Sequence, residues 1–438
     1  MNRYDSYKDS GVEWIGEIPK HWKNSKYKFH TNVLSGFPFK SELFDTEDGF
    51  PILRIRDVTS GSSKTYYKGE YKEEYVVKSG DLLIGMDGDY NIRWWDNYNV
   101  LLNQRCCSIK EFNSVLRRFL FYVLPFDLQI INDLTYYTTV KHLSNSDIYD
   151  SNLIVPPLSE QQQIVSFLDD KTQKIDSLKQ QKEKKIELLK EKRTSLINHV
   201  VTKGLDSNVE MKDSGVEWIG EIPSGWNVSK FKYHSEIITG NTPSKTREEE
   251  FYTSDEDSFP WVKPSSLDKG FGYVTESVEY LTELGKNETR LVPKNSIMVC
   301  SIGNTLGKFG ISGIELSTNQ QINSVVTDEE TLTTRYCMFF ISVLTEDLIK
   351  WTNFVTLPIF TKTDFEDTEI IIPPLSEQQQ IVEYLDKQTE EIETLIQLEQ
   401  KKIETLKEYR QSLISEVVTG KIRVCKEDTS LSLNSQTV

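Results

Sequence analysis

A ten-residue phrase occurs twice in this chain, and its repetition limits the architectures that the chain can adopt. Pro-Pro-Leu-Ser-Glu-Gln-Gln-Gln-Ile-Val begins at Pro156 and again at Pro373, an offset of 217 residues. A second phrase, Lys-Asp-Ser-Gly-Val-Glu-Trp-Ile-Gly-Glu-Ile-Pro, begins at Lys8 and again at Lys212, an offset of 204 residues. Such self-similarity indicates a tandem duplication, and it has to be found before any local pattern is interpreted.

The two copies agree in some stretches and differ in others. The opening phrase and the charged stretch after each Pro-Pro agree, whereas residues 26–155 and 230–372 agree only in scattered places. Constant modules suit a scaffold or two identical partners, and variable modules suit recognition of two different targets. The alternative is a stable duplicated architecture whose variable parts have simply drifted.

Length and composition place the chain among ordinary globular proteins. Its 438 residues leave room for two to four domains. The polar start after Met1 predicts no signal peptide, and no apolar run approaches the ~20 residues of a membrane span. The five cysteines are scattered without zinc or redox spacing, which predicts reduced cytosolic thiols.

The net charge of −16 is spread unevenly along the chain. Residues 1–159 carry 19 basic and 21 acidic side chains, whereas residues 208–376 carry 14 basic and 26 acidic side chains. This balance argues against indiscriminate nucleic-acid binding, although local basic patches can still face a phosphate backbone.

The variable stretches predict mixed domains made mostly of strands. Residues 51–56 read as a strand with Arg54 and Arg56 on one face, and the glycine-bounded run 80–85 reads as an apolar strand. Residues 101–107 are expected to end a loop and start a strand, 259–263 to lead a strand, and 293–300 to form a turn into a strand; short helices are expected at 115–124 and 127–134. The two opening phrases contain Trp14 and Trp218. Each phrase is expected to form a compact anchor that docks on another element, with its tryptophan buried.

Each Pro-Pro phrase predicts a long helix. Ser159 followed by Gln162 fits a capping box, and Gly204 supplies a stop. Such charged helices cannot bury their apolar stripes alone, which predicts an antiparallel intramolecular coiled coil; two independent surface helices are the alternative. The sequence also allows a break in the first helix near residues 169–172, which would divide it into a short helix and a long one. The stripes are Leu168, Ile175, Leu189 and Leu196, widened by Leu178, Ile186 and Ile197, and Leu385, Ile392, Leu406 and Leu413, widened by Leu395, Ile403 and Ile414.

Patterns that carry catalysis are not found. The loop from Gly303 to Lys308 is one residue too short for a phosphate-binding loop, and Phe309 stands where Ser or Thr is needed. The Pro-Pro phrases lack the polar residue before and the aromatic residue after that an amino-methyltransferase needs. His142, His199 and His234 have no partners at catalytic or metal spacing. These observations favour a binding protein.

Side chains suited to nucleic-acid recognition gather on loops between the expected strands. Arg and Lys can bridge guanine edges, Asn and Gln can bridge adenine edges, and amides beside glycines can meet phosphates. Asn103-Gln104-Arg105 and Asn319-Gln320-Gln321 stand at corresponding places late in the two variable stretches. The alternative is that Asn-Gln only caps a strand turn.

At this point the chain resembles the specificity subunit of Type I restriction–modification systems. The resemblance covers nearly the whole length and rests on the two repeated phrases, on Gly-Asn-Thr-Leu-Gly-Lys from Gly303 and on Thr-Asn-Gln-Gln from Thr318. The first variable stretch departs from the pattern, because Met86-Asp87-Gly88-Asp89 stands where the second has Ile302-Gly303-Asn304-Thr305.

The resemblance implies two tandem α/β (mixed α+β) target recognition domains, separated by long antiparallel coiled-coil helices, with a pseudo-two-fold internal repeat. The domains would span residues 1–155 and 208–372, the helical spacers 156–207 and 373–423, and a disordered tail 424–438. It further implies a non-catalytic cytoplasmic subunit that reads a bipartite site in double-stranded DNA, with half-sites about one helical turn (~34 Å) apart.

The partners implied are two methyltransferase (modification) subunits and one restriction/translocase subunit, with no membrane. S-adenosylmethionine, ATP and Mg would serve those partners, and this chain would hold no cofactor or metal. The alternative function is a coiled-coil scaffold whose variable domains bind proteins; an enzyme with an unrecognised site is a third class. The residues expected to bind DNA are Lys40, Arg54, Arg56, Lys64, Arg93, Asn103, Gln104, Arg105, Lys141, Thr242, Lys245, Lys263, Asn304, Thr305, Lys308, Asn319, Gln320 and Lys362, and those expected to bind partner subunits are Trp14, Trp218, Glu160, Gln161, Glu377 and Gln378.

Overall fold

The fold was analysed in a computed structural model of the chain. The structure describes residues 3–112, 114–134, 141–244, 247–267, 270–352 and 359–424, without the side chains of Leu134, Asn304 and 346–352. Lys245 and residues 425–438 of the expected tail therefore lie outside the described residues.

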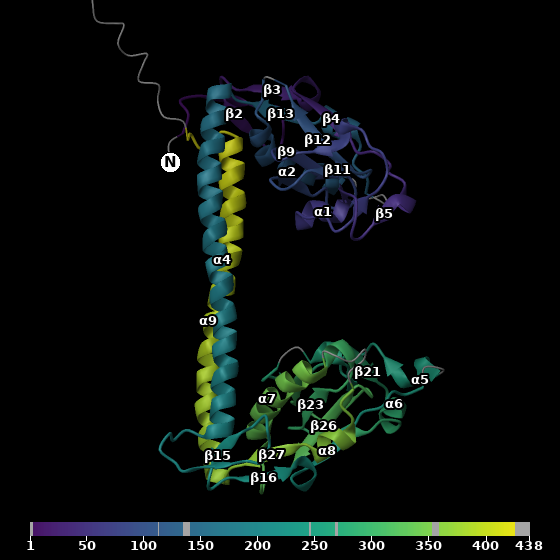
Figure 1. The fold of residues 1–438 in the computed structure, drawn as a ribbon, viewed down its shortest axis with the longest axis vertical. Helices are drawn as coiled ribbons and strands as arrows, with labels where there is room; N and C mark the ends of the chain where they lie inside the picture. Colours follow the sequence, from purple (N-terminus) through teal and green to yellow (C-terminus); the bar gives the residue numbers. More distant parts are fainter. Residues whose placement is uncertain are drawn as a thin grey trace, which may run out of the picture. The chain divides into compact units, whose positions relative to one another are not determined.

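The chain forms two compact units that do not follow the linear order of the predicted domains. Unit 1 comprises Met1–Lys182 and Lys401–Val438, and unit 2 comprises Glu183–Gln400. Two long helices, α4 (Leu158–Lys203) and α9 (Leu375–Val418), each contribute one part to either unit. Each unit thus contains one variable module and a segment of both helices (Figure 1).

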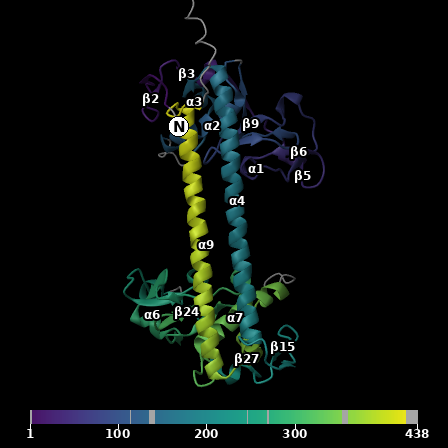
Figure 2. The same ribbon diagram turned by 90° about the vertical axis from the view of Figure 1, so that its left-hand side faces the viewer.

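The helices pack against each other in antiparallel fashion, as predicted. Within unit 2, Lys185 pairs with Glu399 at 2.9 Å and Arg193 pairs with Glu393 at 3.1 Å. Residue numbers therefore increase along α4 in the direction in which they decrease along α9. Within unit 1, the guanidinium of Arg410 lies 3.3 Å from the carboxylate of Asp176. The two helices run side by side in each unit in both Figures 1 and 2.

The buried seam between the helices is narrower than the apolar stripe of the sequence. Ile175 and Ile392 are buried, but Leu178 and Leu395 leave 46% and 41% of their surface exposed. Two helices bury little more than the a and d positions of a heptad, so side chains beside the seam stay in solvent. The expectation that Leu178 and Leu395 widen the buried stripe was therefore wrong.

The start of α4 also differs from the prediction. The helix begins at Leu158, where the amide of Gln161 donates to the carbonyl of Pro157 at 2.9 Å. Ser159 therefore lies inside the first turn and caps nothing. The helix runs without a break through residues 169–172, and Gly204 ends it with a φ of +78°, as expected.

In its described residues, the variable module of unit 1 contains two larger sheets, one two-stranded pair and three helices. Its 3-10 turns are Tyr27–Phe29, Ser41–Leu43 and Glu73–Tyr75. The first sheet has the strand order β10 (Ile92–Trp95), β9 (Asp81–Gly85), β12 (Cys106–Glu111), β4 (Thr31–Ser35). The second sheet has the strand order β5 (Phe44–Asp45), β7 (Tyr66–Tyr67), β6 (Phe50–Leu53), β11 (Val100–Leu102), β8 (Val76–Val77). Strand β13 (Asn152–Val155) pairs with β3 (Lys23–Lys26), and the helices are α1 (Ile55–Ser60), α2 (Arg117–Leu134) and α3 (Asn145–Asp150).

The module of unit 2 repeats this plan with one additional strand, β20. Its 3-10 turns are Phe231–Tyr233, Pro264–Ser266 and Gly303–Thr305. The first sheet has the strand order β17 (Ser235–Thr239), β26 (Ile322–Thr327), β23 (Ile297–Cys300), β24 (Phe309–Ser312), β20 (Tyr273–Val274). The second sheet has the strand order β18 (Tyr252–Thr253), β21 (Glu279–Leu281), β19 (Phe259–Val262), β25 (Leu316–Thr318), β22 (Leu291–Val292). Strand β16 (Asn227–Lys230) pairs with β27 (Glu369–Ile372), and the helices are α5 (Glu248–Phe251), α6 (Glu283–Asn287), α7 (Thr334–Thr352) and α8 (Lys362–Asp367).

Two local predictions in unit 1 were wrong. The strand expected at 51–56 ends at Leu53, and helix α1 follows directly, with Arg54 at its N-cap. The two short helices expected at 115–124 and 127–134 are one helix, α2, with Pro125 inside it. Pro125 is exposed, so the backbone hydrogen bond that proline removes is lost on the side of the helix that water reaches.

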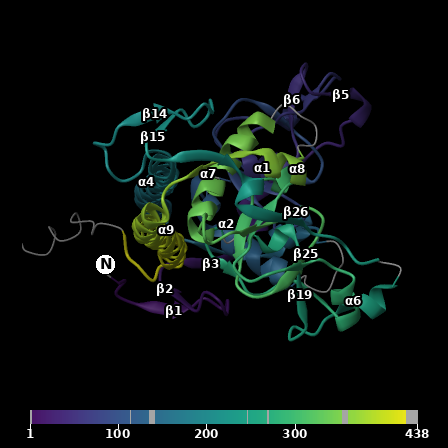
Figure 3. The ribbon, with the colours of Figure 1, turned by 90° about the horizontal axis from the view of Figure 1, so that it is seen from below.

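The opening phrases form hairpins that dock on the chain itself. In unit 1 the hairpin is β1 (Tyr7–Asp9) with β2 (Glu17–Pro19), and in unit 2 it is β14 (Met211–Asp213) with β15 (Glu221–Pro223), which lies beside the end of α4 (Figure 3). The Trp14 ring stacks on Phe126 at 6.0 Å, and the Trp218 ring lies 5.7 Å from Phe340. Both tryptophans are half-buried anchors.

One buried polar pair distinguishes the two cores. The hydroxyl of Tyr27 donates to the carboxyl of Asp127 at 2.6 Å in the core of unit 1. The equivalent positions in unit 2, by the offsets of 204 and 217 residues, are Phe231 and Leu344, both buried and apolar. Burial raises the pKa of Asp127 to about 7.

This pair predicts a pH dependence that the Tyr27→Phe/Asp127→Leu variant should lack. Because the folded pKa of Asp127 lies above its unfolded value, its contribution to stability is complete below about pH 3.8 and is lost as the pH rises through about 7. The loss amounts to about 4 kcal/mol at ~1.4 kcal/mol per pKa unit. Urea unfolding at pH 5 and pH 8 should show the variant gaining stability relative to the wild type at pH 8. Asp127→Asn, which keeps the hydrogen-bond acceptor but cannot ionise, should show the same loss of pH dependence.

Candidate nucleic-acid interface

The turns after β11 and β25 have the same pattern of backbone hydrogen bonds in the two units, although Arg105 has a positive φ and its counterpart Gln321 does not. In unit 1 the amide of Cys106 donates to the carbonyl of Asn103 at 3.2 Å, and in unit 2 the amide of Ile322 donates to Asn319 at 3.1 Å. The carbonyl of the third turn residue, Arg105, accepts from Met86 at 2.8 Å, as the carbonyl of Gln321 does from Ser301 at 2.8 Å. The predicted correspondence of the two Asn-Gln elements is confirmed.

A glycine holds the neighbouring loop against each turn. The amides of Gly36 and Gly240 donate to the carbonyls of Cys106 and Ile322. A Cβ atom on Gly36 would lie 2.0 Å from the carbonyl oxygen of Asn103, and one on Gly240 would lie 2.3 Å from that of Asn319. Only glycine permits this approach, so the loop is fixed beside the turn in both units.

These contacts bring four loop segments of unit 1 together, which we call loop cluster 1. An isolated bridge between Phe37 and Asn103 joins segments 36–40 and 103–105, and a bridge between Asp87 and His142 joins segments 86–88 and 141–142. Loop cluster 1 consists of residues 36–40, 86–88, 103–105 and 141–142; loop cluster 2 of unit 2 consists of residues 240–244, 301–308, 319–321 and 359–362.

Arg105 is an exposed cation of loop cluster 1. Its φ of +71° is unusual for a residue with a side chain, and it turns the chain so that Gln104 and Arg105 both reach solvent. The guanidinium lies 3.5 Å from Asp87, whose carboxylate is 2.6 Å from a ring nitrogen of His142. An arginine held at its side but open at its end can bridge a guanine edge.

Loop cluster 2 presents a different set of side chains on a turn with the same backbone hydrogen bonds. The hydroxyl of Thr242 donates to the side-chain carbonyl of Gln320, which is exposed. The hydroxyl of Thr305 donates to the carbonyl of Ile302 at 3.1 Å, and Lys362 is exposed at the start of α8 beside Glu366. At the turn itself, the cluster therefore offers the neutral side chain of Gln320 where loop cluster 1 offers Arg105.

The asparagines of the two turns are buried. Asn319 donates to Gln321 at 2.9 Å and accepts from its amide at 3.1 Å, and the Asn103 side chain is 8% exposed. The structure therefore favours the alternative in which Asn caps the turn for Asn319, whereas no hydrogen-bond partner is found for the buried side-chain oxygen of Asn103 among the described residues. It also shifts the predicted register by one residue, because Asp87 and Ile302 form the equivalent bridges, so that Gly88 corresponds to Gly303.

The remaining residues predicted to bind DNA differ in position. Arg54 and Lys263 follow β6 and β19, which run parallel to β11 and β25, so both lie at the edge of the turns; Lys263 is paired with Glu279. Arg93 donates to the carbonyls of Val58 and Thr59 and is held by α1 rather than open to a ligand. Lys40, Lys141 and Lys308 lie in the loop clusters, Arg56 and Lys64 are exposed in and after α1, and the side chain of Asn304 is among those not described.

Sequence reasoning missed two residues beside these turns. His142 joins Asp87 and Arg105 in loop cluster 1, although its sequence neighbours gave it no partner. Arg290 is exposed in unit 2, where its guanidinium donates to the carbonyl of Thr239 at 2.8 Å and its amide to the side chain of Asn241 at 2.9 Å. Only contacts between distant segments identify them.

The repeated Ser-Glu-Gln phrase joins each helix to its own module. The side chain of Gln161 accepts from the amide of Leu116 at 2.8 Å and donates to the carbonyls of Pro156 and Ser114. The side chain of Gln378 accepts from the amide of Thr333 at 2.9 Å in the same way. Both glutamines are fully buried, so the prediction that they contact partner subunits is wrong for the chain as described.

The glutamates of this phrase hold the hairpin modules. Glu160 accepts from the indole of Trp22 at 3.0 Å and from the hydroxyl of Tyr4 at 3.0 Å. Glu377 accepts from the indole of Trp226 at 2.7 Å. The identity of the phrase in the two copies therefore has an internal cause, which is the same joint built twice.

The joint predicts a stability difference between adjacent glutamines. Gln161→Ala should lower the free energy of unfolding of the chain by about 3 kcal/mol, because a buried amide and two carbonyls lose their partner. Gln162→Ala, at an exposed position one residue later, should change it by less than about 0.5 kcal/mol. Urea titration followed by tryptophan fluorescence measures both, and equal effects would contradict the assigned role.

Comparison with known proteins adds to this geometry. A family described as "Type I restriction modification DNA specificity domain" matches residues 19–188 and 223–408, one match for each copy. The chain belongs to this type I DNA specificity family. The matched ranges include both loop clusters, α4 up to residue 188 and α9 up to residue 408.

Members of the family align along most of the chain. The EcoBI type I restriction enzyme specificity subunit of Escherichia coli is 26% identical over 398 residues, covering 86% of this chain and 81% of that protein. The MjaVIII specificity subunit of Methanocaldococcus jannaschii is 24% identical, covering 87% and 88%. A solved structure shares the fold; its description concerns the structural basis of complex assembly and conformational transition of the type I R-M system. The TM-score is 0.70 at 17% sequence identity, and the match covers 92% of this chain and 99% of that chain.

Proposed function

We propose that this chain is the specificity subunit of a type I restriction–modification complex, in which loop cluster 1 reads one half of a split DNA site and loop cluster 2 reads the other. Each cluster would enter a groove with its exposed side chains, and the buried asparagines would hold the turns rigid. The chain itself would carry out no chemistry, because its role is to choose the sequence.

The observation that carries this proposal is the same turn bearing different side chains. The backbone hydrogen bonds of the two turns match, whereas the exposed side chains change from Gln104 and Arg105 to Gln320. A scaffold would need no such arrangement. A pair of DNA readers needs a fixed frame with interchangeable contacts, since phosphate contacts position a protein and base contacts specify the sequence.

The partners of such a subunit follow from the family. Two methyltransferase subunits using S-adenosylmethionine would modify adenine in the two half-sites, with the base flipped into their own pockets. One restriction/translocase subunit would use ATP and Mg, and the complex would work in the cytoplasm. Leu178 and Leu395, exposed at equivalent positions of the two long helices, support two equal contacts with identical partners. Among the described residues, none of the helices is both long and apolar enough to cross a membrane.

Methylation mapping tests the proposal. DNA from cells that co-express this chain with its neighbouring methyltransferase subunit would be sequenced by a method that detects methylated adenine. A single split motif, methylated on both strands and absent without this chain, is expected. Unmodified DNA, with the two subunits shown to be expressed and bound, would contradict modification by the complex. A footprint on the purified complex would then separate a silent specificity subunit from a protein-binding scaffold, since the scaffold leaves no sequence-specific footprint.

A further inference from the structure

The first sheet of unit 2 has an edge strand that the first sheet of unit 1 lacks. Strand β20 lies parallel to β24, where the amide of Ile311 donates to Gly272 at 3.3 Å and the amide of Gly313 donates to Val274 at 2.8 Å. In unit 1 the equivalent of β24 is β10, which among the described strands pairs only with β9. No partner is found for the amide of Trp94, the counterpart of Ile311, among the residues that the structure describes. The edge of β10 is thus open.

The segment before β20 also places an aromatic ring between the sheet and the long helices of unit 2. The ring of Phe271 lies 5.4 Å from Phe309 and 5.2 Å from Phe339. The guanidinium of Arg193 lies 5.8 Å from the ring centre, and Arg335 donates to the carbonyl of Phe271 at 2.8 Å. Phe271 therefore plugs this space with both its side chain and its backbone.

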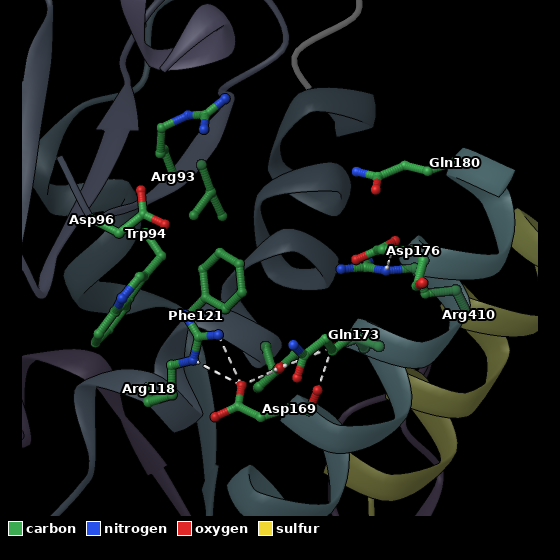
Figure 4. A pocket seen from close by; sticks show the side chains of 14 residues that line it. Arg93, Trp94, Asp96, Arg118, Phe121, Asp169, Gln173, Asp176, Gln180 and Arg410 are labelled. Carbon is green, nitrogen blue, oxygen red and sulfur yellow. Dashed lines mark hydrogen bonds and ion pairs between the residues drawn. The ribbon is translucent and has the colours of Figure 1, made fainter. Parts of the chain in front are cut away.

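The same space in unit 1 is a cavity of about 750 Å³ between β10, α2 and the long helices (Figure 4). The offset of 217 residues makes Arg118, Tyr122 and Arg410 of its wall the counterparts of Arg335, Phe339 and Arg193. The strand register makes Ile92 the counterpart of Phe309. Every residue that holds Phe271 in unit 2 thus has a counterpart in the wall of the unit 1 cavity.

The arginine of this cavity is held in the same way in both units. Arg118 donates to Asp169 at 2.9 Å, as Arg335 does to Asp386 at 2.9 Å. A second N–H group of Arg335 donates to the carbonyl of Phe271. For Arg118, no carbonyl partner is found in the described part of the chain. Arg118 leans instead over the ring of Trp94 at 4.6 Å, so its outer edge faces the cavity.

We propose that the open edge of β10 and the adjoining cavity bind an extended segment of a partner protein, with an aromatic side chain in the cavity. The segment adds a strand parallel to β10, accepts from the amide of Trp94 and from Arg118, and inserts its ring as Phe271 does in unit 2. Strand addition of this kind takes its affinity from main-chain hydrogen bonds and its specificity from the pocket beside them.

The charges of the wall favour a peptide over a nucleic acid. The cavity is lined by three arginines, Arg93, Arg118 and Arg410, and by three aspartates, Asp96, Asp169 and Asp176. Such a wall has no net positive charge for a phosphate backbone, whereas DNA binding depends on neutralised phosphates. The proposal does not depend on the proposed function, because unit 2 supplies its template.

A peptide binding assay tests the site with the full chain and without DNA. The probe is a fluorescein-labelled peptide with the sequence of residues 269–276, Lys-Gly-Phe-Gly-Tyr-Val-Thr-Glu, and the readout is fluorescence anisotropy. We expect saturable binding, and about ten-fold or greater weakening when the phenylalanine of the peptide is alanine. Ser177→Trp, which puts a ring into the cavity from an exposed position of α4, should abolish binding, whereas Gln181→Trp, exposed but outside the wall, should leave it unchanged.

The proposal is overturned by absence of saturable binding up to millimolar peptide, by equal affinity for the alanine peptide, or by undisturbed binding to the Ser177→Trp chain. The assembled complex gives a second test through a photo-crosslinking residue at Gln173 in the wall. A crosslink to a partner protein supports the proposal. A crosslink to DNA alone, or none with any macromolecule, overturns it.

Discussion

Removal of one heptad from each long helix should change the DNA sequence that the complex methylates without changing either half-site. The deletions are residues 183–189 of α4 and 396–402 of α9, which face each other because Lys185 pairs with Glu399. Seven residues are two turns of a coiled coil, so the buried seam stays in phase. At ~1.5 Å per residue the pair loses about 10 Å, which corresponds to at most about three base pairs. We therefore expect the original split motif to lose methylation and a motif with a shorter gap to replace it.

The control for this prediction is the deletion in α4 alone. It leaves two helices of unequal length whose ion pairs no longer meet, so methylation should be lost without a new motif. Methylation mapping of cells that express each variant measures the result. Altered half-sites with an unchanged gap would show that the helices do not set the spacing.

Replacement of both exposed residues of the unit 1 turn should abolish recognition of one half-site only. In the Gln104→Ala/Arg105→Ala variant, two side chains that can bridge base edges are removed from loop cluster 1. Each such contact discriminates by about 1–3 kcal/mol, so specific binding should weaken by about 100-fold. The turn itself should persist, because Asn103 and Gly36 hold it through backbone contacts.

The matched control for that variant is Gln320→Ala in loop cluster 2. Methylation by the control should become less selective in the other half-site and stay unchanged in the first. Binding of the purified complex to DNA with substitutions in each half-site measures both effects, and urea unfolding checks that stability is retained. If both variants relaxed the same half-site, the assignment of one cluster to each half would be wrong.

Local patterns predicted the helices and the repeat correctly but not every element between them. Heptad spacing predicted α4 and α9, the glycine-bounded apolar run 80–85 predicted β9, and the turn and strand at 293–300 predicted β23. The alternation of apolar and charged residues at 51–56 wrongly predicted a strand over the whole segment. Arg54 and Arg56 instead belong to the start of a short helix, whose boundary depends on packing against β9. Burial of Gln161 and Gln378 could not be read from their spacing, since their partners are 45 residues away in the sequence.

Comparison of the two copies in the sequence alone determined a good deal about this protein. It established the duplication, the constant joints, the variable modules and the equivalence of the Asn-Gln turns, because a repeated phrase meets the same physical demand twice. Only the tertiary structure decided which of these residues reach solvent, and that Phe271 fills in one unit a space that remains open in the other. Periodicity reports the neighbours of a residue along one element, whereas burial and cavities arise from elements that meet across long stretches of chain.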